Sequence, residues 1–175
     1  MDDSKRDRKH NLINLGFLFV FGTAFGFVEA AVVYYLRALI NFHKNFSLIH
    51  YKVLLNLGFI TFISPSHSIL LSNKVTAIEI TREFATIVLL ISVAYIAGID
   101  LRQRAGALLI SFACWDITYY VFLKILDNWP TSLMTRDVYF LIPVTWIGPV
   151  ITPLVICTVM LTMGIKLYVR PSAKP

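Results

Sequence analysis

The chain has 175 residues and a formal net charge of +6, with 57% apolar and 15% charged residues. Soluble domains contain about 45–50% apolar and about 25% charged residues, so this composition excludes an ordinary soluble domain and predicts one transmembrane domain over residues 1–175. The basic residues flank apolar runs and form no stripe with interleaved aromatic residues. This pattern excludes nucleic acid as a partner and leaves the lipid bilayer as the expected one.

The first apolar run predicts a retained transmembrane helix over about residues 12–37, because it is longer than the apolar part of a signal peptide. Small residues recur in it at positions i, i+4 and i+8, a spacing that lets another helix approach closely. This row consists of Gly22, Gly26 and Ala30. Glu29 lies beside the row, and Arg37 follows two turns later on the same side.

Segment 41–74 is predicted to be an extracytoplasmic loop that lies partly on the membrane surface. Its stretch 46–63 is long enough to cross a bilayer, but it carries His50 and Lys52. Counting it as a span would place the basic loop at 102–104 on the opposite side from the basic N-terminus. We therefore expect four spans with both termini in the cytoplasm, and five spans remain the alternative.

The second span is predicted over about residues 79–99, and it opens with three charged residues on one helical face. These are Glu79, Arg82 and Glu83. The uncharged part, 84–99, would cover only about 24 Å of a hydrocarbon core about 30 Å thick. The three charges are therefore expected at or inside the membrane boundary.

The third span is predicted over about residues 105–126, and one stripe of this helix is polar. The stripe includes Asp116, Tyr119, Tyr120 and Lys124. The fourth span is predicted over about 138–166. Three prolines within it, at 143, 149 and 153, should kink or unwind the helix, as in the broken helices of transporters or in purely structural spans.

On this topology, the polar residues of three spans fall in the extracytoplasmic half of the membrane. The expected cluster is Glu29, Arg37, Glu79, Arg82, Glu83, Asp116, Tyr119, Tyr120 and Lys124. Its four acids and three bases leave one carboxylate without a basic partner. Such charges are costly in hydrocarbon, so they should either form an ion-pair lattice that fixes helix register or build a site for a proton, a metal ion or a cationic group.

Several cofactor chemistries are disfavoured by the residues available. The spans contain no histidine, which argues against both a di-iron centre and haem. A single hard cation is compatible with oxygen ligands, for which Glu83 and Asp116 are the candidates, with His67 within reach from the loop. The two cysteines, Cys114 and Cys157, lie in apolar runs and are expected to be free thiols.

Four segments, "TREFATIVLL", "WDITYYVFLKIL", "WPTSLMTRD" and "FLIPVTWIGPV", together resemble an uncharacterised family of small polytopic membrane proteins of bacteria. The resemblance extends from Glu29 to Pro153 and omits most of 41–74. It implies a bacterial inner membrane, and it implies no activity and no catalytic residues.

The sequence therefore predicts an all-α transmembrane bundle whose polar cluster near the outer leaflet handles a proton, a cation or a membrane-soluble substrate. Glu83 and Asp116 would be the carboxylates that bind the cation or exchange the proton. Arg82 and Lys124 would be their charge-setting partners, and Tyr119 or Tyr120 would donate hydrogen bonds. The alternatives are a non-catalytic small subunit that assembles with larger membrane partners and a small transporter that works as a homo-oligomer. The sequence leaves open whether the protein is an enzyme.

Overall fold

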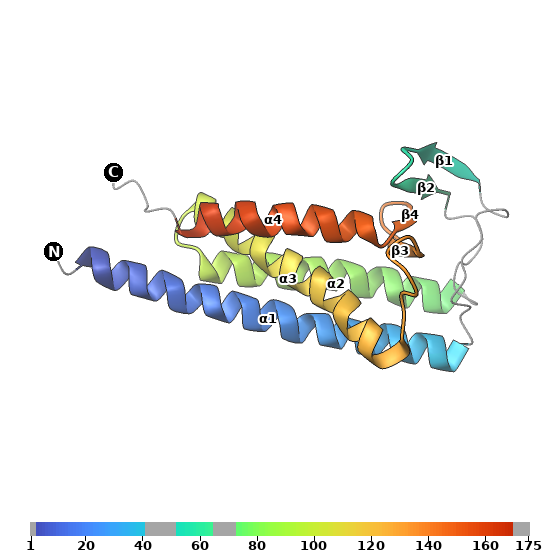
Figure 1. Cartoon of the computed structure of the whole chain (residues 1–175), viewed down its shortest axis with the longest axis horizontal. Helices are drawn as coiled ribbons and strands as arrows, with labels where there is room; N and C mark the ends of the chain where they lie inside the picture. The colour runs from blue at the N-terminus through green and yellow to red at the C-terminus, as the bar shows by residue number, and fades with distance from the viewer. Residues whose placement is uncertain (1–2, 41–51, 65–72, 170–175) are drawn as a thin grey trace.

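The computed structural model describes residues 3–40, 52–64 and 73–169, which form four long helices and a small antiparallel sheet (Figure 1). The helices are α1 (Asp3–Ile40), α2 (Asn73–Ala97), α3 (Leu101–Asp127) and α4 (Ile151–Val169). All four are long and apolar enough to cross a membrane, which confirms that part of the prediction.

Helix α3 is the centre of the bundle and contacts each of the other three helices. In its most apolar stretch 56% of the residues are buried, against 22% or less in the other three helices. The outer helices instead expose large apolar side chains, such as those of Phe17, Phe84 and Val159. An exterior of this kind is suited to contact with lipid.

The row of small residues in α1 packs against α3 within the chain. A Cβ atom added to Gly22 would lie 2.5 Å from the Cβ atom of Cys114, and one added to Gly26 would lie 2.7 Å from the carbonyl oxygen of Trp115. Ala30, the third member of the row, is fully buried. The small residues therefore let the backbones of α1 and α3 approach closely, as their spacing predicts.

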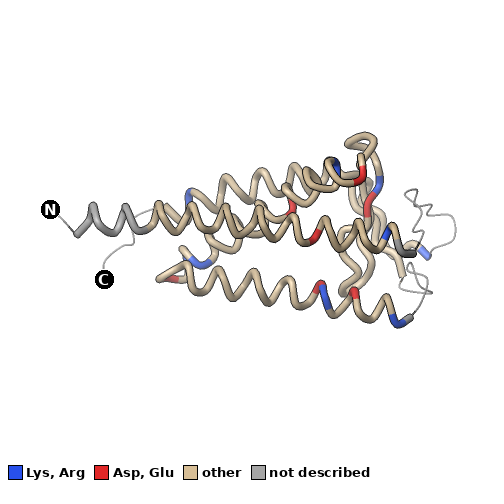
Figure 2. Tube along the Cα trace, turned by 90° about the horizontal axis from the view of Figure 1, so that it is seen from below, with Lys and Arg blue, Asp and Glu red and all other residues tan. Residues whose placement is uncertain are grey.

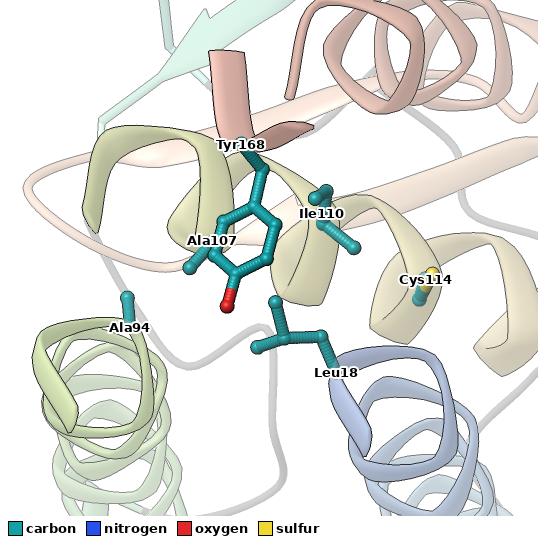
Figure 3. Close-up of a cluster of buried hydrophobic side chains, with 6 residues drawn as sticks. All are labelled: Leu18, Ala94, Ala107, Ile110, Cys114 and Tyr168. Atoms are coloured by element: carbon teal, nitrogen blue, oxygen red, sulfur yellow. The ribbon is translucent and has the colours of Figure 1, made fainter. Parts of the chain in front are cut away.

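All four helices contribute to an apolar core in the half of the bundle nearer the two chain ends (Figures 1 and 3). This core contains Leu18, Ala94, Ala107, Ile110, Cys114 and Tyr168. The hydroxyl of Tyr168 on α4 donates a hydrogen bond of 2.8 Å to the carbonyl oxygen of Ala97 at the end of α2. Both cysteines are buried free thiols, as predicted.

The sheet lies at the end of the bundle opposite the two termini (Figure 1). Its strands are β1 (Val53–Asn56), β2 (Thr61–Ile63), β3 (Arg136–Phe140) and β4 (Thr145–Pro149), in the order β1-β2-β4-β3 with antiparallel neighbours. Phe62 on β2 pairs with Trp146 on β4, so the central contact joins two hairpins far apart in the sequence. The hydroxyl of Thr152 donates to the carbonyl oxygen of Phe59 at 3.2 Å, which fastens the first hairpin to the start of α4.

The sheet corrects the expectation of an all-α fold and of one helix over 138–166. Residues 136–149 instead form the β3–β4 hairpin, and α4 begins only at Ile151. Proline has no backbone N–H and is tolerated in turns and in the first turn of a helix. Accordingly, Pro143 lies between the two strands, Pro149 ends β4, and Pro153 lies in the first turn of α4.

The alternative of a fifth helical span over 46–63 does not agree with the structure, because the described part of this stretch, residues 52–63, contains strands β1 and β2 and no helix. Two other parts of the expected 41–74 loop, 41–51 and 65–72, lie outside the described residues, and its last two residues, 73 and 74, begin α2. His67, the histidine considered as a further ligand, belongs to the part 65–72.

Candidate functional site

Charged positions gather toward the end of the bundle that carries the sheet (Figure 2). There, α1, α2, α3 and the segment 137–141 surround a cavity of about 130 Å³, which is large enough for several water molecules. Five carboxyl groups and two guanidinium groups line it. The carboxyl groups belong to Glu29, Glu79, Glu83, Asp116 and Asp137, and the guanidinium groups to Arg37 and Arg82.

Arg82 on α2 joins two of the carboxyl groups. Its Nη1 atom lies 2.5 Å from Oε2 of Glu29 on α1, and its Nη2 atom lies 2.7 Å from Oε2 of Glu79 one turn earlier on α2. The Nε atom also donates to Glu79 at 2.8 Å. Two carboxylates thus share one guanidinium, so this group of three side chains carries a net charge of −1 when all are ionised.

Glu83 lies one position after Arg82 and accepts hydrogen bonds from the segment that follows β3. The backbone N–H of Leu141, just after β3, donates to both carboxylate oxygens of Glu83, at 3.0 and 2.9 Å. The side chain is nine-tenths buried. A buried carboxylate is therefore held by a neutral donor, and the bond ties α2 to the segment that covers the cavity.

Asp116 and Asp137 also accept hydrogen bonds from neutral groups. The thiol of Cys157 on α4 donates to Asp116 on α3 at 3.3 Å, and the hydroxyl of Tyr120 donates to Asp137 on β3 at 2.9 Å. Burial raises the pKa of Asp137 to about 6, although nearby Arg37 and the Tyr120 hydroxyl both act to lower it.

Aromatic side chains complete the wall of the cavity. Trp115, Tyr119 and Tyr120 of α3 line it together with Tyr139 and Phe140 of β3. The rings of Tyr119 and Tyr120 contact each other with centroids 4.8 Å apart, and those of Trp115 and Phe140 lie 6.4 Å apart. The hydroxyl of Tyr139 donates to the carbonyl oxygen of Pro149 at 2.7 Å, which leaves the ring fixed against β4.

Arg37 lines the cavity, but its guanidinium pairs with an acid outside it. The Nη1 atom lies 3.1 Å from Oδ2 of Asp127 at the end of α3. The guanidinium carbon also lies 4.0 Å from the centroid of the Trp129 ring, in a cation–π contact. Much of the positive charge of Arg37 is therefore compensated away from the five cavity carboxyl groups.

Lys124 was expected to set the charge of the cluster, but it does not line the cavity. Its side chain is exposed and donates to the carbonyl oxygens of Asn128 at 3.4 Å and of Pro130 at 3.0 Å. Carbonyl groups after the last helical turn lack helical partners, so a lysine in that turn readily bonds to them. The structure thus brings together eight of the nine expected cluster residues.

Asp137 is the cavity residue that the sequence analysis did not include. It directly precedes the expected fourth span at 138–166, whereas in the structure it lies on β3 and accepts a hydrogen bond from Tyr120 of α3. An available signal was the run of β-branched and aromatic residues on either side of Pro143, which is typical of strand, turn and strand. With Asp137 counted and Lys124 removed, the cavity has five acids and two bases, and the excess of carboxyl groups is larger than expected.

Metal coordination is not favoured by the geometry. Within residues 3–40, 52–64 and 73–169, no three carboxylate, histidine or cysteine side chains come close enough to hold one metal ion together. Glu83 and Asp116, the candidate ligands, therefore have no third protein ligand of these types in the described part of the chain. Comparisons with protein-family models, curated proteins and solved structures find no match to this chain, so its function is argued from the geometry alone.

Proposed function

We propose that this chain is a multi-pass protein of the bacterial inner membrane whose carboxyl-rich cavity, near the outer leaflet, handles a proton, a cation or a membrane-soluble substrate. Both termini would lie in the cytoplasm, so the sheet would cover the cavity on the outer side. Glu83 and Asp116 would exchange the proton or cation. Arg82 would set the charge by neutralising part of the acidic group.

One observation carries this proposal: three carboxyl groups of the cavity accept their hydrogen bonds from neutral donors. These are the carboxyl groups of Glu83, Asp116 and Asp137. An ion-pair lattice that serves only to fix helix register would be expected to match each acid with a base, because an unpaired charge is costly in a membrane. A carboxyl group that has taken up a proton or bound a cation no longer carries an unpaired charge, so it avoids that cost.

The alternative of a non-catalytic subunit drew on the row of small residues in α1, which could have bound a partner helix. In the structure this row packs against α3 of the same chain. The charged residues likewise line a cavity within one chain. Neither feature requires a protein partner. A site that handles a proton, a cation or a membrane-soluble substrate is therefore the function that the geometry supports best.

Chemical labelling of the carboxyl groups tests the proposal. N,N′-dicyclohexylcarbodiimide enters lipid and reacts with protonated carboxyl groups in apolar surroundings to form a stable N-acylurea. In inner-membrane vesicles, peptide mass spectrometry should find the label on Glu83 or Asp116. The label should be lost from the replaced position in Glu83→Gln and Asp116→Asn.

Asp100→Asn is the matched control. Asp100 lies at the opposite end of the bundle and caps α3 by accepting from the backbone N–H of Gln103 at 2.7 Å, a role that asparagine fills equally well. This variant should be labelled in the cavity like the unmodified protein. Folded protein with no label on any cavity carboxyl group would contradict the proposal.

A further inference from the structure

We infer that the cavity binds an amphipathic ammonium ligand, meaning a protonated or quaternary amine on an apolar body. This inference rests on the proposed function and narrows its substrate class. It follows from the placement of the carboxyl groups, from the aromatic wall and from the apolar part of the lining.

Three carboxyl groups of the cavity form no ion pair within hydrogen-bond distance among the described residues, and they come from three different elements. Glu83 lies on α2, Asp116 on α3 and Asp137 on β3. A small metal ion needs several oxygen ligands at one point, and the described residues do not offer such a group. A protonated amine needs no such convergence, because a single carboxylate can hold it through one charge-assisted hydrogen bond.

The aromatic wall supplies the second requirement for an organic cation. The faces of tryptophan, tyrosine and phenylalanine rings attract ammonium groups, and cages of such rings recognise quaternary amines. Trp115, Tyr119, Tyr120 and Phe140 all line the same cavity as the carboxyl groups. Carboxylates combined with aromatic rings favour an organic cation over a hydrated inorganic one.

Much of the remaining lining is apolar and would contact the apolar body of the ligand. Val33 and Leu36 of α1 face the same cavity as Val138 and Leu141 of the hairpin segment. Binding sites for small molecules commonly combine an apolar wall with a few polar groups that fix orientation. A bare proton or inorganic ion would make no use of these side chains.

The inference can be tested with n-hexylammonium and its neutral counterpart n-hexanol, which differ in charge but little in shape. Binding to the full chain in phosphatidylcholine nanodiscs is measured by isothermal titration calorimetry. We expect n-hexylammonium to bind at least about tenfold more tightly than n-hexanol, and Asp116→Asn or Glu83→Gln to reduce its affinity by about tenfold. Asp100→Asn should bind like the unmodified protein, and the unfolding midpoint of each variant verifies that it is folded.

Equal binding of the two compounds, or equal binding by cavity variants and the Asp100→Asn control, would overturn the inference. Tighter binding of Mg²⁺ than of n-hexylammonium would overturn it in favour of a metal site. If the carbodiimide labels Glu83 or Asp116 while n-hexylammonium does not bind, the inference fails and the proposed function stands. If neither the label nor the ammonium is found, both fail.

Discussion

Arg82 holds together the ion pairs of the cavity, so its replacement by glutamine should destabilise the protein. The guanidinium lies 2.5 Å from Glu29 and 2.7 Å from Glu79, and the side chains of the two acids are 11% and 8% exposed. Glutamine keeps a polar side chain and removes the positive charge. Two largely buried carboxylates would then lack their cation.

The size of the effect follows from this burial. Removing one partner of a buried ion pair costs about 3–5 kcal/mol, because the other charge is left uncompensated. The side chain of Arg82 is itself 25% exposed and borders a cavity that has room for water. We therefore expect Arg82→Gln to lower the free energy of unfolding by about 3 kcal/mol, at the lower end of that range.

Arg102→Gln is the matched control for the loss of an arginine. Arg102 lies 3.9 Å from Asp100, with side chains 28% and 35% exposed, and such surface pairs contribute about 0–1 kcal/mol. Unfolding is followed by circular dichroism during titration of the detergent-solubilised protein with sodium dodecyl sulfate. Adding Glu29→Gln to Arg82→Gln should recover part of the lost stability, because it removes one uncompensated carboxylate.

The reasoning would be refuted if Arg82→Gln cost less than about 1 kcal/mol, as expected for the Arg102→Gln control. It would also be refuted if Glu29→Gln lowered the stability of the Arg82→Gln protein further. Either result would mean that the three side chains do not act as a buried ion-paired unit.

Three further predictions follow. Gly26→Ala should cost about 1–3 kcal/mol of unfolding free energy, because the new Cβ atom would lie 2.7 Å from the Trp115 carbonyl oxygen. Gly16→Ala, where the new Cβ atom would have nothing within 4 Å, should be neutral or stabilising. Equal stability of the two variants would contradict the α1–α3 packing. Burial raises the pKa of Asp137 from 3.8 to about 6, so the folded protein retains a proton that the unfolded chain releases near pH 4. Unfolding free energy, measured between pH 4 and pH 7, should therefore fall by about 3 kcal/mol as the pH rises, and Asp137→Asn should remove this part of the slope; an unchanged slope would argue against a buried carboxyl group. Green fluorescent protein fused to either terminus should fluoresce in bacterial cells and alkaline phosphatase fused there should be inactive, and an active phosphatase fusion would contradict cytoplasmic termini.

The four long helices were predictable because each contains an apolar run whose length is set by the bilayer. Their limits were less accurate at the polar ends. Helix α2 begins at Asn73 and not at Glu79, because its charged residues do not end the helix but face the cavity. Local hydropathy locates the apolar part of a helix, whereas contacts with other elements decide how far it extends.

The β3–β4 hairpin was missed because residues 138–149 are uncharged and run directly into the apolar α4. Hydropathy does not separate an apolar strand from an apolar helix segment. The three prolines were read as kinks in one helix, although their spacing also suits a turn, a strand end and a helix start. Pairing of β4 with β2, more than 80 residues earlier in the chain, could not be read from local sequence.

The carboxyl-rich site was only partly predictable for the same reason. Helical spacing placed Glu29, Arg82 and Asp116 on inward faces of their helices, and all three line the cavity. Asp137 lines the cavity because the β3–β4 hairpin places it there. Lys124 does not line the cavity, because it bonds to the carbonyl oxygens of Asn128 and Pro130 just after α3. Neither placement follows from the helical spacing of the polar residues.

Infrared difference spectroscopy of the protein in phosphatidylcholine nanodiscs tests the central claim most directly, because the vibration of a carboxyl C=O group reports its own protonation. Spectra recorded at neutral and acidic pH should contain carboxyl bands that disappear in Glu83→Gln or Asp116→Asn and persist in Asp100→Asn. Such bands would mean that cavity carboxyl groups exchange protons with water. Identical spectra for all three variants would mean that the cavity carboxyl groups are fixed in one state, and would contradict a site that handles protons or cations.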